Sequence, residues 1–114
     1  MEFKIGTKNI GDNHPVFIIA EMSCNHLQNY DYAVEIIKKA KEAGADAIKL
    51  QTYTPDTMTI DCNNKYFSLK GTIWEGKTLY ELYQEAYTPW EWQPKLKKIA
   101  EELGLIFFST PFDK

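Results

Sequence analysis

The chain has 114 residues, of which 13 are basic and 16 acidic, giving a formal net charge of −3. No excess of one charge sign points to nucleic acid or a membrane surface, and no apolar run approaches the ~20 residues that span a bilayer. The 44% hydrophobic content is sufficient for a packed core. We therefore expect a cytoplasmic protein with no nucleic-acid or membrane partner, in which Cys24 and Cys62 are free thiols.

The first half of the chain predicts one strand–helix–strand unit behind a hairpin. Residues 3–11 contain two brief alternating stretches around a Gly-Thr turn. The continuous apolar run 16–20 predicts a strand covered on both faces, as in parallel sheets. Asn29 can cap a helix that ends at Gly44, and residues 45–51 form the next strand.

The second half begins with an unusually long connection, residues 53–77, which is polar and aromatic and has no clear period. Ordinary connections are ~2–6 residues, and long ones tend to be binding loops or lids. A short helix is expected over 78–87. Residues 88–91, Thr-Pro-Trp-Glu, match a capping box with proline at the first helical position, so a helix should begin there and end at Gly104. Residues 105–109 predict a third strand.

Each predicted strand ends on polar residues of kinds that chemistry uses. Glu21 follows the first strand, Lys49 and Gln51 lie in the second, and Ser109 and Thr110 end the third. Parallel strands gather such residues at one rim, where α/β enzymes keep their active sites. Residues two apart in a strand share a face, so Lys49 and Gln51 should point the same way.

The residues alone leave several alternatives open. Lys49 either binds an anion or extends into solvent, while Glu21 is an acid or base, a salt-bridge partner of Lys49, or both. Asn25 and His26 offer hydrogen bonds or a metal ligand, although a lone loop histidine is more often neither. The Thr110 hydroxyl donates to an anion or simply belongs to a turn. Since P-loop, GxGxxG, HExxH and GxSxG motifs are absent, the residues predict an α/β enzyme with an anion-binding rim.

Three spaced segments carry a resemblance to a known family. They are AE-x-x-x-NH at residues 20–26, K-x-QT at 49–52 and F-x-STPFD at 107–113. With these segments, in this order, the chain resembles the sialic acid synthase family over nearly its whole length. Residues 71–80 and 87–92 are similar to the pseudaminic acid synthase branch of that family.

The resemblance implies an α/β fold, namely the N-terminal portion of a TIM (β/α)₈ barrel, with about three βα units and a leading β-hairpin. Because the βα rhythm stops after the third strand, we expect residues 1–114 to be the N-terminal part of a synthase barrel. The rest of the barrel and a C-terminal antifreeze-like domain would then lie outside this chain. A homodimer is expected for the full-length protein.

The activity implied by the resemblance is condensation of phosphoenolpyruvate with a sugar aldehyde, 2,4-diacetamido-2,4,6-trideoxy-L-altrose, giving pseudaminic acid and phosphate. Glu21 matches the active-site glutamate, and a group of further residues is expected to form the substrate pocket: Lys49, Gln51, Thr110, Phe112 and Asn25. A divalent metal, Mn²⁺ above all, is implied for the full-length enzyme. Neither His14 nor His26 matches a family metal ligand, so residues 1–114 alone should bind metal poorly and have no turnover.

Two alternatives accompany this prediction. In the first, the chain belongs to another kind of synthase in the same family, one that makes neuraminic or legionaminic acid from a different sugar. A protein of another class would be a non-catalytic remnant or binding module that keeps the rim without the chemistry. A histidine pair encoded downstream would favour the enzyme, and a stop codon the remnant.

The connection 53–77 is expected to overhang the barrel mouth and to sense the sugar's acetamido or 6-methyl groups.

Overall fold

The computed structural model describes residues 1–114 and contains two separate sheets. Strands β1 (Phe3–Ile5) and β2 (Lys8–Ile10) form the expected antiparallel hairpin. Strands β3 (Ile19–Glu21), β4 (Ala47–Thr52) and β5 (Ile106–Pro111) form a parallel sheet in the order β3-β4-β5. The predicted parallel α/β arrangement is confirmed.

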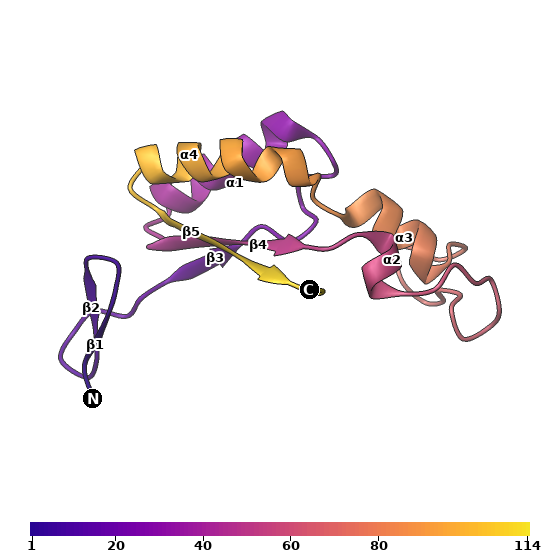
Figure 1. Ribbon diagram of the computed structural model, residues 1–114, viewed down its shortest axis with the longest axis horizontal. Coiled ribbons are helices and arrows are strands. Elements are labelled where there is room, and N and C mark those ends of the chain that lie inside the picture. Colours follow the sequence, from indigo (N-terminus) through magenta and orange to yellow (C-terminus); the bar gives the residue numbers. More distant parts are fainter.

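Two helices, α1 (Tyr30–Glu42) and α4 (Gln93–Glu102), cover one face of this sheet (Figure 1). The Asn29 side chain caps α1 as expected, accepting the N–H of Tyr32 at 3.1 Å. Between helices and sheet lies a single apolar core, in which each fully buried aliphatic side chain contributes ~1.5–3 kcal/mol. Its buried members are Met22, Ala33, Ile37, Ala45, Ile48, Leu50, Leu96, Ala100 and Leu105.

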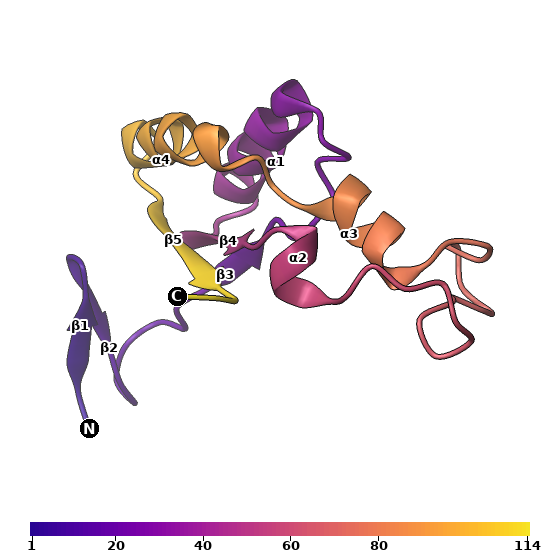
Figure 2. The ribbon, with the colours of Figure 1, turned by 45° about the vertical axis from the view of Figure 1, so that its right-hand side comes forward.

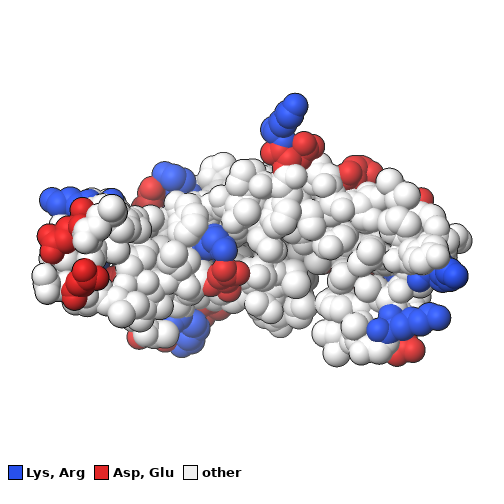
Figure 3. All heavy atoms as spheres, turned by 90° about the horizontal axis from the view of Figure 1, so that it is seen from below, with Lys and Arg blue, Asp and Glu red and all other residues white.

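The opposite face of the sheet carries no helix, and we call it the open face (Figure 2). The prediction that the first strand is covered on both faces is therefore wrong: Val16 is 83% exposed and Ile19 44% exposed. Of the predicted strand 16–20, only Ile19 and Ala20 belong to the ladder, which continues to Glu21, and β3 pairs with β4 alone. Figure 3 looks onto this face, where a cationic and an anionic side chain lie side by side within a largely uncharged surface.

The hairpin lies at the amino ends of the strands, away from the long connection (Figures 1 and 2). Lys8 Nζ is 3.1 Å from Asp46 Oδ1, and Asp46 Oδ2 accepts the Ile18 N–H at 2.9 Å. The hydrogen bond from the Ile18 N–H, and to a smaller extent the one from Lys8, lowers the pKa of the Asp46 carboxyl group. Gly6 has a φ of +60° and approaches Ile106 so closely that an added Cβ would lie 3.1 Å from Cδ1. The hairpin thus abuts the amino-terminal end of the sheet.

The long connection, residues 53–77, which we call the insert, follows β4 beyond the carboxyl ends of the strands (Figure 1). It contains one helical turn, α2 (Pro55–Met58), and leads into α3 (Leu79–Ala86), where the predicted short helix is confirmed. A capping box fixes the start of α3: Glu81 N–H donates to Thr78 Oγ1, and Thr78 N–H donates to Glu81 Oε2. No helix of the structure is long and apolar enough to cross a membrane.

The capping box predicted at residues 88–91 is wrong. A 3₁₀ turn, η1 (Trp90–Trp92), precedes α4, and neither helix has a side-chain cap at its start. The Thr88 hydroxyl is instead hydrogen-bonded to Nε2 of the buried His26 at 2.9 Å. A buried imidazole left without a partner would cost more free energy than a lost helix cap. This difference explains why the Thr88 hydroxyl bonds His26 and does not cap the helix. The predicted helix end at Gly104 is confirmed by its left-handed φ of +75°.

Candidate active site on the open face

The strand register brings four of the predicted site residues onto one face. Glu21 is the ladder partner of Lys49, and Gln51 is the partner of Thr110. Partners in a ladder point to the same side of a sheet, and residues two apart share that side. Glu21, Lys49, Gln51 and Thr110 therefore all belong to the open face, while the alternate residues Ile48 and Leu50 are buried beneath the helices.

Glu21 and Lys49 form an ion pair, with 2.5 Å between Oε1 and Nζ. The Glu21 side chain is 55% exposed and that of Lys49 27% exposed. The predicted salt bridge is confirmed, and Lys49 does not extend freely into solvent. Because exposed pairs contribute only ~0–1 kcal/mol to stability, the fold gains little from placing these charges on the open face.

Several hydrogen-bond donors beside this pair have no partner within the chain. The side chains of Gln51 and Thr110 make no intramolecular hydrogen bond, and every buried side-chain nitrogen or oxygen does have one. These donors therefore reach solvent. Lys49 has three N–H donors, of which Glu21 occupies one. An ammonium, an amide and a hydroxyl on adjacent strands are the groups that hold a phosphate or carboxylate.

Ser109 belongs to the other face. Its hydroxyl lies 2.7 Å from Thr52 Oγ1, which also accepts a hydrogen bond from Gln93 Nε2 at 2.8 Å. This network joins β5, β4 and α4 on the helical side of the sheet. Of the two hydroxyls that end the third strand, Thr110 alone faces the Glu21–Lys49 pair.

The structure does not bring Asn25 to these residues. Its side-chain N–H donates to the Met22 carbonyl at 3.0 Å, and its side chain lies beside Tyr32 and Ile36 on the flank of α1. The sequence placed Asn25 near the rim because it follows Glu21 by only four residues. The loop turns back toward α1 within that distance.

Phe112 is one of three aromatic residues, with Tyr53 and Tyr83, whose rings contact one another in turn. Its ring meets Tyr53 edge-on at 5.6 Å between centroids, and Tyr53 meets Tyr83 of α3 at 5.7 Å. The Trp90 indole N–H donates to the Tyr53 carbonyl at 3.2 Å. Tyr53 is only 4% exposed, and burial raises its pKa to about 12. Phe112 is thereby held at the rim by Tyr53 at the start of the insert, which is itself supported by residues of α3 and η1.

Sequence reasoning missed two features of this region. Phe108 is the ladder partner of Lys49 on the open face and is 38% exposed. Its position two residues before Thr110 is the signal that identifies it. His26 is fully buried and bonded to Thr88, a contact between positions 62 residues apart that no local pattern reveals.

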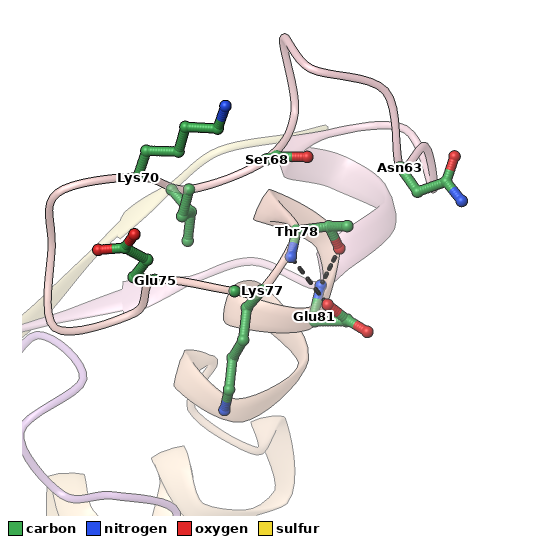
Figure 4. A pocket seen from close by; sticks show the side chains of 9 residues that line it. Asn63, Ser68, Lys70, Glu75, Lys77, Thr78 and Glu81 are labelled. Carbon is green, nitrogen blue, oxygen red and sulfur yellow. Dashed lines mark hydrogen bonds between the residues drawn. The ribbon is translucent and has the colours of Figure 1, made fainter.

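A second hollow lies in the insert, as Figure 4 shows. Lys70 and Lys77 extend from it in different directions, and Thr78 and Glu81 are occupied with the capping box of α3. Lys77 also pairs with Glu85 and lies over the Trp74 ring. Lys77, Thr78 and Glu81 are thus engaged with other residues of the chain, and the two lysines do not converge on a common point.

The residues of this chain do not fit a divalent-metal site. No group of three or more His, Cys, Asp or Glu side chains comes together in residues 1–114. The one carboxylate among the site residues of the open face, Glu21, is bound to the Lys49 ammonium. The Nδ1 atom of His26 is occupied by the Gln28 backbone N–H, and its Nε2 by Thr88.

A parallel sheet with helices on one face, polar residues at the carboxyl ends of its strands and a hairpin at the amino ends is the arrangement expected for the N-terminal portion of a TIM (β/α)₈ barrel. The chain belongs to the NeuB family, whose sequence profile matches residues 36–114. The resemblance inferred from the three segments is confirmed.

The relatives include synthases of several acidic sugars. The chain is 47% identical over 106 residues to the pseudaminic acid synthase of Campylobacter jejuni, covering 93% of this chain and 31% of the relative. It is 48% identical over 98 residues to that of Helicobacter pylori, covering 86% and 29%. The N,N'-diacetyllegionaminic acid synthase of Legionella pneumophila is 37% identical over 109 residues, with 96% and 31% covered.

The solved structures agree with this family assignment. The N-acetylneuraminic acid synthetase of Leptospira borgpetersenii, solved with citrate, superimposes with a TM-score of 0.78 at 32% identity, covering 99% of this chain and 35% of that one. This chain spans about a third of the length of the curated relatives it matches.

Proposed function

We propose that residues 1–114 form the first part of the catalytic barrel of a pseudaminic acid synthase. The reaction would join phosphoenolpyruvate to 2,4-diacetamido-2,4,6-trideoxy-L-altrose and water, releasing phosphate. The observation that carries the proposal is the Glu21–Lys49 pair on the open face, flanked by the unpaired donors of Gln51 and Thr110. Identity of 47–48% to two pseudaminic acid synthases supports the choice of product.

Phosphoenolpyruvate brings a phosphate and a carboxylate, so its site needs a fixed cation and hydrogen-bond donors. Lys49 supplies the charge from the middle of β4, and Gln51 and Thr110 supply an amide and a hydroxyl from neighbouring strands. A rigid sheet holds these groups at fixed separations, which lowers the entropic cost of binding. We assign all three residues to this ligand.

Glu21 would act on the carbon that becomes electron-poor during the reaction. As C3 of phosphoenolpyruvate bonds to the aldehyde carbon, the aldehyde oxygen takes a proton and positive charge develops at C2. Water then adds to C2 and loses a proton. The C2 hydroxyl formed in this way gives up its own proton, to the departing phosphate or to solvent, as the bond between C2 and the phosphate oxygen breaks, which releases phosphate and leaves a keto acid. A carboxylate beside C2 stabilises that charge or accepts the water proton. The ion pair with Lys49 holds the Glu21 carboxylate in position for this role.

The sugar would lie toward the insert, beyond the carboxyl ends of the strands. Phe112 and Phe108 offer apolar surface there, being 41% and 38% exposed. The contact of Phe112 with Tyr53, and of Tyr53 with Tyr83, couples this wall to α3. We propose that the insert distinguishes the acetamido and 6-methyl groups of the sugar. Exchanging residues 59–77 for those of a neuraminate synthase should shift sugar preference, and an unchanged preference would count against this assignment.

A divalent metal such as Mn²⁺ would polarise the sugar aldehyde, but residues 1–114 present no set of ligands for it. We therefore assign it no residue of this chain. We also propose that residues 1–114 alone have no turnover, because they supply the anion-binding and carboxylate groups without the other walls of a barrel. Phosphate release by this segment alone would contradict that statement.

The test is phosphate release by the complete protein that contains residues 1–114. It would be supplied with phosphoenolpyruvate, Mn²⁺ and, separately, 2,4-diacetamido-2,4,6-trideoxy-L-altrose, N-acetylmannosamine or the legionaminic acid precursor sugar. The proposal predicts the highest kcat/KM with the altrose derivative. A preference for either other sugar would identify the alternative synthase, and failure with all three would favour a non-catalytic remnant.

A further inference from the structure

The loop between β3 and α1 contains a fully buried histidine whose two ring nitrogens are both hydrogen-bonded. The Gln28 backbone N–H donates to His26 Nδ1 at 2.9 Å, and Nε2 lies 2.9 Å from Thr88 Oγ1. The Trp92 ring packs edge-on at 5.6 Å from the imidazole. The His26–Thr88 contact joins this loop to the segment between α3 and η1, 62 residues later.

The hydrogen bonds determine which nitrogen carries the proton. A backbone N–H can only donate, so Nδ1 of His26 must be the acceptor and is unprotonated. The proton is then on Nε2, which donates to the Thr88 hydroxyl. Burial lowers the pKa of His26, in agreement with a neutral ring. The groups that contact the ring, namely Gln28 N–H, Thr88 and Trp92, carry no charge.

Gln28 adds two further bonds between the same segments. Its side-chain Nε2 donates to the carbonyls of Gln84 and Tyr87, each at 3.0 Å. These carbonyls lie at the end of α3, where helix geometry leaves the last carbonyls without partners. The His26 and Gln28 side chains together therefore fix the carboxyl end of α3 against the β3–α1 loop.

The loop needs such support because its backbone is strained. Ser23, Leu27 and Gln28 have φ values of 49°, 50° and 51°, in the left-handed region that side chains other than glycine disfavour by ~1 kcal/mol or more each. Leu27 is 67% exposed, so its packing offsets little of that cost. The strained loop begins directly after Glu21, where the Met22 N–H donates to the Lys49 carbonyl at 3.0 Å.

We propose that His26 and Thr88 are positioning residues that hold the loop after Glu21 and the end of α3 in one geometry, and thereby shape the sugar side of the site. The sugar part rests on the proposed function. Lys49, Gln51 and Thr110 lie on strands and do not depend on this link, whereas α3 carries Tyr83, which packs on Tyr53. Loosening the link should affect the sugar and spare phosphoenolpyruvate.

The test compares Thr88→Val with Thr88→Ser in the complete protein. Valine keeps the shape of threonine but leaves His26 Nε2–H without an acceptor, whereas serine restores the hydroxyl. We expect Thr88→Val to raise the KM for the sugar about fivefold to tenfold, as losing one net hydrogen bond does, with the KM for phosphoenolpyruvate within about twofold. Thr7→Val, at an exposed hairpin position, controls for the threonine-to-valine exchange.

A purely structural role would lower kcat through loss of folded enzyme and leave both KM values unchanged, and this result would overturn the proposal. Thr88→Val with wild-type kinetics would overturn it equally.

Two further measurements test the link between His26 and Thr88 without measuring activity, and they do not depend on the proposed function. Nitrogen NMR of the wild-type protein at pH 7 should show His26 protonated on Nε2, and protonation on Nδ1 would overturn the link. Amide hydrogen exchange across residues 79–88 should be at least about fivefold faster in Thr88→Val than in Thr88→Ser. Equal exchange in the two variants would refute the positioning role even in a protein that turns over none of the three sugars.

Discussion

Glu21 and Lys49 are ladder partners on adjacent parallel strands, and their side chains meet at 2.5 Å on the face of the sheet that no helix covers. A pair that is partly open to solvent adds little to stability. Its position beside Gln51 and Thr110 instead gives it the composition of an anion site with a carboxylate at its edge. Substitutions at Glu21 and at Lys49 should therefore separate the role of the carboxylate from that of the cation.

Replacing Glu21 by Gln removes the charge and keeps a group that can hydrogen-bond Lys49. We expect kcat of the complete enzyme to fall by ~10²-fold or more, the usual range for a general acid or base, with the KM for phosphoenolpyruvate little changed. Steady-state phosphate release measures both. Glu35→Gln, which alters an exposed helical pair with Lys38, is the control and should retain full activity. Wild-type kcat in Glu21→Gln would remove Glu21 from the chemistry.

Replacing Lys49 by Met removes the cation and retains the apolar stem. Because hydrogen bonds to charged groups contribute ~1.5–3 kcal/mol, the KM for phosphoenolpyruvate should rise at least tenfold. Urea unfolding should show a stability change of at most ~1 kcal/mol, since the Glu21 carboxylate left without its partner is 55% exposed and reaches solvent. Lys38→Met, at a surface position of α1, is the matched control. An unchanged KM would assign the anion to other residues.

The sequence predicted the parallel sheet and the shared face of Lys49 and Gln51, because alternation along a strand is local information. It also predicted the cap at Asn29, where the capping atom lies three residues from its partner. It misassigned Thr88, whose hydroxyl bonds a histidine 62 residues away instead of its own helix. Such a bond depends on how α3 returns to the sheet, which local patterns do not specify.

Asn25 illustrates the same limit at shorter range. Its distance from Glu21 along the chain suggested a place at the rim, but the β3–α1 loop, which has a left-handed residue at Ser23 and two more after Asn25, places it beside α1. Nothing in a polar loop sequence specifies three left-handed residues other than glycine. They persist because the His26 and Gln28 hydrogen bonds hold them.

The buried His26 predicts how stability depends on pH. Its folded-state pKa lies below the ordinary value of 6.5, so the unfolded chain binds a proton that the folded chain does not. This contribution to the free energy of unfolding is complete above pH 6.5 and is lost as pH falls from there to the folded-state pKa.

Urea unfolding at pH 7.5, 6.5 and 5.5 should therefore show a steeper loss of stability in wild type than in His26→Gln. His14, the other histidine, lies 3.5 Å from Glu2 near the hairpin and is common to both proteins. The difference between the two pH profiles thus isolates His26. Parallel profiles would show that His26 is not held neutral in the folded protein.

Condensation at the Glu21–Lys49 pair is tested by the rate of phosphate release by the complete protein with phosphoenolpyruvate and 2,4-diacetamido-2,4,6-trideoxy-L-altrose, measured for wild type and Glu21→Gln in parallel. The proposed function predicts release that requires both substrates and falls by ~10²-fold in the variant. Release without the sugar, or equal rates in the two proteins, would contradict a condensation carried out at the Glu21–Lys49 pair.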